Sequence, residues 1–334
     1  MGFALLTTVI AQPTATATLR RALASGHVHH AYVFDGLDGV GKERAAFGLA
    51  QALVCERRAA NGDEACGECA SCVRAVPRSG ERTPLHPDVV VLERGLYDPA
   101  AIGRRSPETQ DISVDQVRAL VLSRAAFAPH EGRARVFIVR RAEELSIAAS
   151  NALLKTLEEP RAGTHFVLLT STLDALIPTI RSRAQRVRFG PLPDEAVCEM
   201  LVARGIPSGN AVRIARIAGG SMAAAVALAD PKSAAERESF VAKAMDALRA
   251  PGLESALELA DMAKKSDKTV AIAHLDGLAM ALAVHAKDAL DKAPQDSHTA
   301  AVRYAIALST LRHIDANASL QLAVEAMCVK MRAV

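Results

Sequence analysis

Short apolar runs alternate with segments of helical period along the first 190 residues. The runs are rich in β-branched and aromatic residues and cover 31–35, 88–92, 135–139, 165–170 and 185–189. Apolar residues recur every three or four positions between most of these runs and also before the first one, as at Leu19 and Leu23 in 14–24. Because strands that alternate with helices form parallel sheets covered on both faces, we predict an α/β fold with a five-stranded parallel sheet.

The pattern changes after Pro191 and Pro193, where the strand-like runs stop. Three short helical patterns follow, up to the turn signal Asp230-Pro231, and the remaining residues have helical period with a break at Pro294. We therefore predict three domains: an α/β domain over 1–190, a small helical domain over 191–231 and an all-helical domain over 232–334.

Composition narrows the class of protein. No window approaches the roughly 18 apolar residues of a membrane span, and the apolar first residues lack the positive start of a signal peptide, so we expect a soluble cytoplasmic protein. Forty basic and 37 acidic residues leave a formal charge of +3, and there are 8 Phe, 3 Tyr and no Trp. A chain that coats nucleic acid through overall charge or aromatic stacking is excluded, so any nucleic-acid contact must be local.

A glycine-rich segment directly follows the first predicted strand. Gly36, Gly39, Gly41 and Lys42 fit the phosphate-binding pattern G-x-x-x-x-G-K, in which backbone N–H groups face phosphates and the lysine reaches the β and γ phosphates. Glu43, however, occupies the position of the Ser or Thr hydroxyl that normally coordinates Mg²⁺. The segment predicts a degenerate nucleotide loop, in which ATP or ADP binding stays open; the alternative is a plain glycine turn.

The strand expected to end in Mg²⁺-binding carboxylates ends in cations. Arg140 and Arg141 follow the run 135–139, and Glu143 and Glu144 come later, where we expect their side chains to lie several ångströms from the strand end. This order predicts that ATP hydrolysis is lost. The alternative for the two arginines is a solvated surface pair.

Four of the six cysteines crowd into 18 positions, 55–72, as Cys55, Cys66, Cys69 and Cys72. Thiolates at this spacing can close a tetrahedral site around Zn²⁺, which would be structural because no coordination position stays open. An iron–sulfur cluster or a redox pair is the alternative. Cys198 and Cys328 lie alone in apolar helical patterns and are predicted to be core residues.

Together these features resemble the bacterial clamp-loader subunits of DNA polymerase III, which belong to the AAA+ superfamily. The resemblance covers about the first 230 residues. It rests on Gln12 in 9–12, the histidines of 29–32, the glycine loop, the four cysteines, His86-Pro87-Asp88, and the segments 151–160 and 180–185. Within the family the chain is similar to the delta-prime subunits. Gamma/tau motor subunits would have a Thr after the lysine, an acidic pair after the third strand and usually a longer C-terminal region.

The resemblance implies an architecture and a role. It implies an AAA+ P-loop domain with a zinc module at 55–72, a helical lid at 191–231, and a helical collar at 232–334 that joins the subunits of a pentameric ring. The partners would be gamma/tau and delta subunits and, through the complex, the sliding clamp and primer-template DNA. The chain would be an ATPase-inactive subunit of the polymerase holoenzyme in the bacterial cytoplasm; an active gamma/tau-type ATPase and a freestanding zinc-dependent DNA-binding module are alternatives.

The resemblance also implies roles for single residues. Thr170 matches the sensor 1 position, although it could be only a strand-end threonine, and Ala223 replaces the sensor 2 arginine. Ser182 and Arg183 match a Ser-Arg-Cys motif whose cysteine is replaced by Ala184. Arg183 is expected to act in trans, as an arginine finger on the ATP of a neighbouring subunit. The alternative is that Arg183 only caps the preceding helix or pairs with a local carboxylate.

Overall fold

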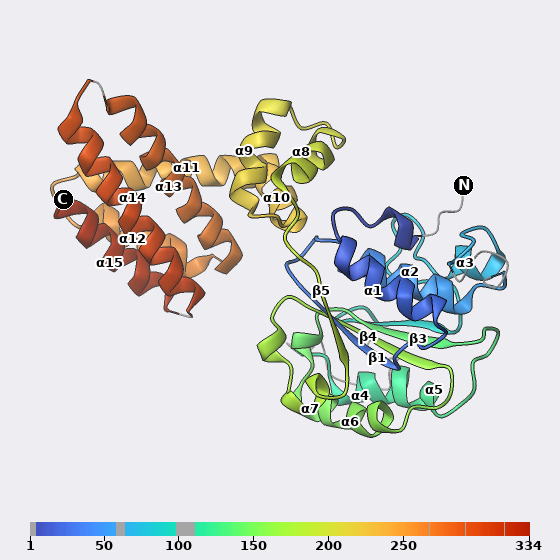
Figure 1. The fold of residues 1–334 in the computed structure, drawn as a ribbon. Coiled ribbons are helices and arrows are strands. Elements are labelled where there is room, and N and C mark those ends of the chain that lie inside the picture. Colours follow the sequence, from blue (N-terminus) through green and yellow to red (C-terminus); the bar gives the residue numbers. More distant parts are fainter. Residues whose placement is uncertain (1–4, 58–63, 98–110, 267, 291, 317) are drawn as a thin grey trace. The chain divides into compact units, whose positions relative to one another are not determined.

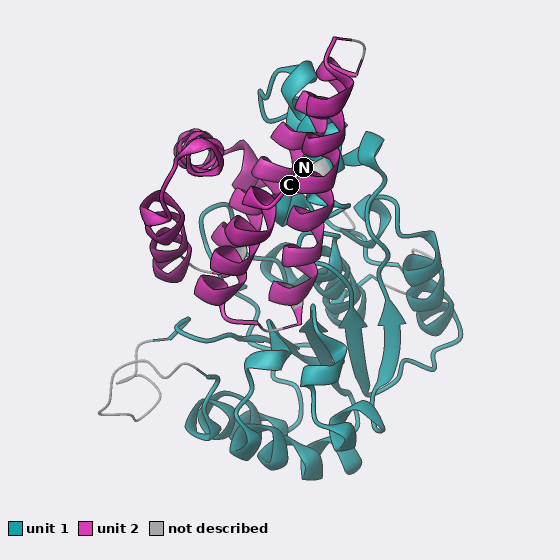
Figure 2. Cartoon of the chain, turned by 90° about the vertical axis from the view of Figure 1, so that its left-hand side faces the viewer, with its two compact units in different colours: residues 1–224 teal, residues 225–334 magenta. Residues whose placement is uncertain are grey.

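The structure is a computed structural model that describes residues 5–57, 64–97, 111–266, 268–290, 292–316 and 318–334. The chain divides into two compact units, Met1–Ala224 and Ala225–Val334 (Figure 2). Each unit has a hydrophobic core of its own. The predicted domain boundaries at 190 and 231 stay predictions.

A five-stranded parallel sheet forms the centre of the first unit, in the order β2-β3-β4-β1-β5 (Figure 1). The strands are β1 (Ala31–Asp35), β2 (Val89–Leu92), β3 (Arg135–Val139), β4 (Thr164–Thr170) and β5 (Gln185–Arg188). Every predicted run forms a strand, so the predicted sheet is confirmed. Asp35 at the end of β1 pairs with Thr170 at the end of β4, which places the loop after β1 beside the end of β4.

Helices cover both faces of this sheet, as predicted. The elements are η1 (Leu5–Thr8), α1 (Pro13–Ala24), α2 (Lys42–Val54), α3 (Ala70–Arg74), α4 (Val114–Val117), the π-helical turn η4 (Arg118–Leu122), α5 (Ser123–Ala125), η5 (Ala142–Glu144), α6 (Ile147–Glu158), η6 (Leu173–Ala175) and α7 (Pro178–Arg181). In Figure 1, α1 and α2 lie on one face and α4 to α7 on the other. Leu19 and Leu23 of α1 are fully buried, which confirms the predicted apolar face.

Asp88 holds the start of β2 to the segment before β3. Its buried carboxylate accepts hydrogen bonds from the backbone N–H of His130 (2.6 Å) and Glu131 (2.8 Å) and from the guanidinium of Arg135 (2.9 Å). Burial by itself would raise the pKa of Asp88, but these donors together hold that pKa below its ordinary value. The carboxylate of Asp88, with all these hydrogen bonds, therefore holds β2 and β3 together. Glu93 directly follows β2, and Arg140 directly follows β3.

Three helices follow the sheet: α8 (Asp194–Val202), α9 (Ser208–Ala218) and α10 (Met222–Ala229). They confirm the three short helical patterns. Cys198 of α8 is only partly buried, so its prediction as a core residue is wrong. The helical period indicates which face of a helix is apolar, but how deeply a residue at the edge of that face is covered depends on the neighbouring elements.

The second unit contains α11 (Pro231–Arg249), α12 (Glu254–Lys265), α13 (Lys268–Ala289), α14 (Pro294–Asp315) and α15 (Leu320–Arg332). Its core includes Phe240, Leu259, Leu275, Ile314 and Met327. Cys328 is buried in this core, as predicted. The break at Pro294 is also confirmed, since α14 begins there.

One helix of the second unit is more apolar than the sequence analysis predicts. Among the described residues, Val270–Ala289 is long and apolar enough to cross a membrane, by length and composition only, with a mean hydropathy of 1.3. The statement that no segment approaches this threshold is therefore wrong. Leu275, Leu278 and Leu282 of this helix belong to the core of the unit, and the core helices of soluble proteins pass the same test.

Candidate functional site

The glycine loop connects β1 to α2 at the carboxyl edge of the sheet. Gly41 is the N-cap residue of α2 and has φ 100°, a conformation that favours glycine. At Gly39 a Cβ atom would lie 2.3 Å from the backbone nitrogen of Ala223, so a side chain has no room there. The N–H of Gly36 donates to the carbonyl oxygen of Thr170 (3.3 Å). The loop is therefore packed tightly between the end of β4 and the start of α10.

A pocket of about 530 Å³ lies beside this loop. Its charged lining residues are four cations and four carboxylates: Lys42, Arg44, Arg140 and Arg141, and Asp38, Glu43, Glu93 and Glu143. These formal charges cancel. A polyphosphate, which is attracted to an excess of positive charge, gains little from such a balanced lining.

The ammonium group of Lys42 is held by the loop itself. It donates to the carbonyl oxygens of Gly36 and Leu37 (2.8 Å for Leu37) and lies 3.3 Å from the carboxylate of Asp38. Its three donors therefore have three acceptors, and the residue is 7% exposed. A bound nucleotide would have to replace these contacts to reach the lysine.

Glu43 and Arg140, the two residues that differ from those of an active ATPase site, are in contact with each other. The guanidinium of Arg140 pairs with the carboxylate of Glu43 and, at 2.9 Å, with that of Glu93. Arg82 pairs with the other oxygen of Glu93 at 2.7 Å, and the ring of Phe47 lies 5.8 Å from the Arg140 guanidinium carbon. A cation thus lies between two carboxylates, in the region where a P-loop ATPase holds Mg²⁺.

The two arginines that were predicted as a possible solvated surface pair differ in their exposure to solvent. The side chain of Arg140 is only 13% exposed, so this interpretation is wrong for Arg140. The side chain of Arg141 is 55% exposed and pairs with Glu144 at 3.3 Å, as a surface residue would.

Glu143 lies nearer to the pocket than predicted. Arg141 has φ 48°, and the turn made there leads into η5, which brings Glu143 to the end of β4. Its Oε1 accepts hydrogen bonds from the hydroxyl (2.8 Å) and the N–H (3.3 Å) of Ser171, and its Oε2 is buried without a partner among the described residues. The predicted distance of Glu143 from the end of β3 stays a prediction, but its place in the pocket beside β4 was not foreseen, because a left-handed residue other than glycine is rare and has no sequence signal.

Thr170 and Ala223 are among the uncharged residues that line the pocket. Thr170 is 1% exposed, and its hydroxyl accepts a hydrogen bond from the N–H of Thr172 (3.1 Å). Ser221 donates to the carbonyl oxygen of Asp38 (2.6 Å), which holds the start of α10 over the loop. Ala223 thus lies where the resemblance places an arginine, and its methyl group contributes no charge.

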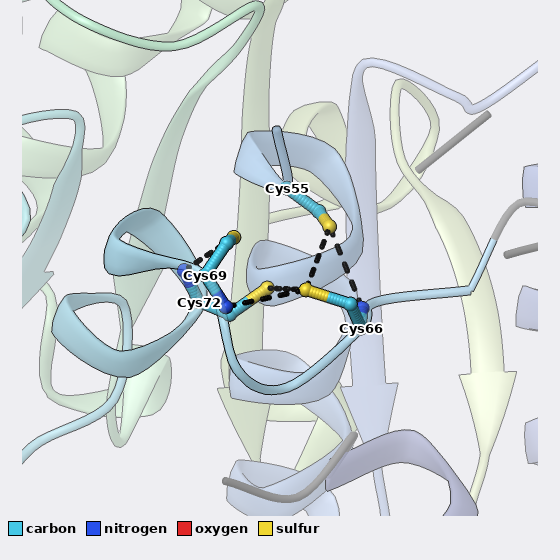
Figure 3. Close-up of side chains that lie close together, drawn as sticks. All are labelled: Cys55, Cys66, Cys69 and Cys72. Carbon is cyan, nitrogen blue, oxygen red and sulfur yellow. Dashed lines mark hydrogen bonds between the residues drawn. The ribbon is translucent and has the colours of Figure 1, made fainter. Parts of the chain in front are cut away.

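The four clustered cysteines converge in space (Figure 3). All four sulfurs lie within 4.8 Å of one another, with 3.7 Å between Cys55 and Cys66 and 3.9 Å between Cys66 and Cys72. Zn–S bonds of about 2.3 Å in a tetrahedron put the sulfurs about 3.8 Å apart. The donors therefore fit one zinc ion, whereas a multi-iron cluster needs more room between its ligands. Residues 58–63 of the predicted zinc module lie outside the described residues.

Backbone N–H groups point at three of these sulfurs. The N–H of Cys66 donates to the sulfur of Cys55 (3.4 Å). The N–H of Cys69 donates to the sulfur of Cys66 (3.3 Å), and the N–H of Cys72 donates to the sulfur of Cys69 (3.4 Å). Burial alone would raise the pKa of Cys66, but N–H donors from Glu68 and Cys69 lower it to about 7. Burial raises the pKa of Cys55 and of Cys72. A metal ion must therefore displace protons from these two buried thiols.

Arg183 follows α7 and lines a second pocket of about 710 Å³. Its guanidinium lies 2.5 Å from a carboxylate oxygen of Glu158 and donates to the carbonyl oxygen of Thr179 (3.0 Å) and the hydroxyl of Ser182 (3.2 Å). Arg183 thus both caps the preceding helix and pairs with a local carboxylate, which are the two contacts of the alternative interpretation. Of the described residues, none lines both pockets, so Arg183 lies apart from the chain's own glycine loop.

Comparisons with known proteins point to one family. The family model described as "DNA polymerase III, delta subunit" matches residues 11–193. The gamma/tau subunit of Mycobacterium tuberculosis is 34% identical over 280 residues, covering 81% of this chain and 43% of that protein. The delta-prime subunit of Bacillus subtilis is 30% identical over 239 residues, covering 71% and 65%.

Among solved structures, a gamma subunit-related protein from Thermotoga maritima is 19% identical, covers 95% of this chain and 98% of its own, and has a TM-score of 0.42. The chain spans less than half the length of the gamma/tau relative and about two thirds of the delta-prime relative.

Proposed function

Because the chain belongs to the DNA polymerase III delta subunit family of clamp-loader AAA+ proteins, we propose that it is a delta-prime-type subunit that does not hydrolyse ATP. It supports the ATP-dependent loading of a sliding clamp onto primer-template DNA, in a pentameric ring with gamma/tau and delta subunits in the cytoplasm. One observation carries this proposal: the Arg140 guanidinium lies between Glu43 and Glu93.

Electrostatics supports the inactivity of this pocket. In an active site a hydroxyl and a strand-end carboxylate bind Mg²⁺, which neutralises the charge that develops on the transferred phosphate. Here Arg140 and Arg82 together balance the charges of Glu43 and Glu93, and the charge of Arg140 repels a divalent cation. Ala223 supplies no sensor 2 charge, although Lys42 and Thr170 match the pattern of an active site.

We assign the remaining parts by the same resemblance. The helices α8 to α10 serve as the lid, α11 to α15 serve as the collar that joins neighbouring subunits, and the four cysteines hold a structural zinc ion. Arg183, aided by Ser182, acts on the γ-phosphate bound by a neighbouring motor subunit. Its separation from the chain's own pocket supports an action in trans.

The purified chain is expected to release no phosphate from ATP in the presence of Mg²⁺. The variant Glu43→Thr should also be inactive, because it restores the hydroxyl but leaves Arg140 at the metal position. A phosphate-release assay on both proteins measures this.

A gamma/tau-type motor is the alternative function, and the unpartnered oxygen of Glu143 in the pocket is the observation that favours it. The variant Glu143→Gln distinguishes a true activity from a contaminating one. Turnover by the wild-type chain that disappears in Glu143→Gln would refute the inactivity.

A further inference from the structure

We propose that Glu158 is a positioning residue that holds Arg183 until a phosphate group of a neighbouring subunit's nucleotide replaces it. The proposal rests on the proposed action of Arg183 in trans. It adds a regulatory contact within this chain, namely a carboxylate that competes with the phosphate for the same guanidinium.

The contacts of Arg183 fix the guanidinium from two sides. Glu158 is the last residue of α6, and its carboxylate oxygen lies 2.5 Å from the guanidinium. On the other side, Thr179 of α7 and Ser182 accept hydrogen bonds. These contacts hold the arginine on the wall of the second pocket, where its side chain is 35% exposed.

The charge distribution explains why Glu158 needs a cation. A carboxylate at the C-terminal end of a helix meets the negative end of the helix dipole. Arg183 compensates this repulsion at Glu158. If Arg183 turns to another anion, Glu158 loses this compensation, so binding of the phosphate and binding of Glu158 are coupled.

The pair is weak enough to be exchanged. The side chains of Arg183 and Glu158 are 35% and 46% exposed. An ion pair with this exposure changes the equilibrium constant between the paired and the separated side chains by up to about fivefold. A phosphate offers more acceptor oxygens and stronger charge-assisted hydrogen bonds than a single carboxylate oxygen. It can therefore displace Glu158, and Glu158 lowers the apparent affinity for the nucleotide without preventing its binding.

The test uses the loader assembled with gamma/tau and delta subunits. The turnover that is lost when this chain carries Arg183→Ala defines the site that Arg183 completes. In the Glu158→Gln complex, the KM for ATP of this Arg183-dependent turnover is expected to fall about two- to fivefold, while its kcat stays unchanged. Glu159→Gln, which removes the same charge one residue later, is the matched control and should leave KM unchanged. An unchanged or higher KM in Glu158→Gln would overturn the proposal.

A double variant separates this proposal from the proposed function. Adding Glu158→Gln to Arg183→Ala should have no further effect on ATP turnover, because Glu158 acts through Arg183. An additional effect would show that Glu158 acts independently and would overturn the inference alone. If Arg183→Ala leaves all turnover intact, the trans-acting arginine itself is refuted and the role of Glu158 with it.

Discussion

Replacing Arg183 by alanine is expected to abolish ATP turnover at one site of the assembled clamp loader. An arginine supplied by a neighbouring subunit stabilises the charge of the phosphoryl-transfer transition state and contributes roughly a thousandfold or more to kcat. Clamp loading should fall further than the loss of one site implies if the sites act in concert. DNA-stimulated phosphate release and clamp loading by the variant complex measure both effects.

The same variant should leave folding and assembly intact, because partly exposed ion pairs contribute about 1 kcal/mol or less. Arg181→Ala is the matched control: Arg181 is the last residue of α7, two positions before Arg183, pairs with Asp174 at 2.6 Å and has a similarly exposed side chain, 34%. Its complex should retain full turnover. If the Arg183→Ala complex kept its DNA-stimulated turnover and clamp loading, Arg183 would not be an arginine finger.

Removal of the metal site is expected to give the largest loss of stability. Protein purified without chelator should contain about one equivalent of zinc, and Cys72→Ser should lose it, because Cys72 is fully buried among the other three sulfurs. Structural zinc contributes about 10–16 kcal/mol to zinc-finger peptides. Here the sheet and α2 supply part of the fold, so we expect a loss of roughly 3 kcal/mol or more.

Metal analysis and urea unfolding measure this prediction. Cys198→Ser serves as the control, because Cys198 lies in α8, outside the cluster, and that variant should keep both metal and stability. Iron instead of zinc, or no metal in the wild-type protein, would contradict the assignment.

The sheet could be predicted from the sequence because its signal is local. The strands β1, β2 and β3 are short runs, rich in β-branched and aromatic residues, that are buried at every position, whereas only Val187 of β5 is buried. The glycine loop and the cysteine cluster were predictable for the same reason, since their members lie close together in the chain.

The partners of the functional residues could not be predicted because they come from other elements. Glu43 and Arg140 are 97 residues apart, and neither position alone indicates that they form a pair. Glu93 and Glu158 were missed as well. Glu93 had a usable signal, since it directly follows β2, and the predicted sheet places β2 and β3 in one layer. The pairing of Glu158 with Arg183 depends on how α6 and α7 pack, which their helical period does not specify.

The stoichiometry of the assembled loader tests the central claim most directly. The chain is to be mixed with gamma/tau and delta subunits of the same organism, and the intact complex weighed by native mass spectrometry. The account predicts a pentamer with a single copy of this chain. A complex without this chain, or a ring in which it occupies several positions as a motor subunit would, contradicts the account.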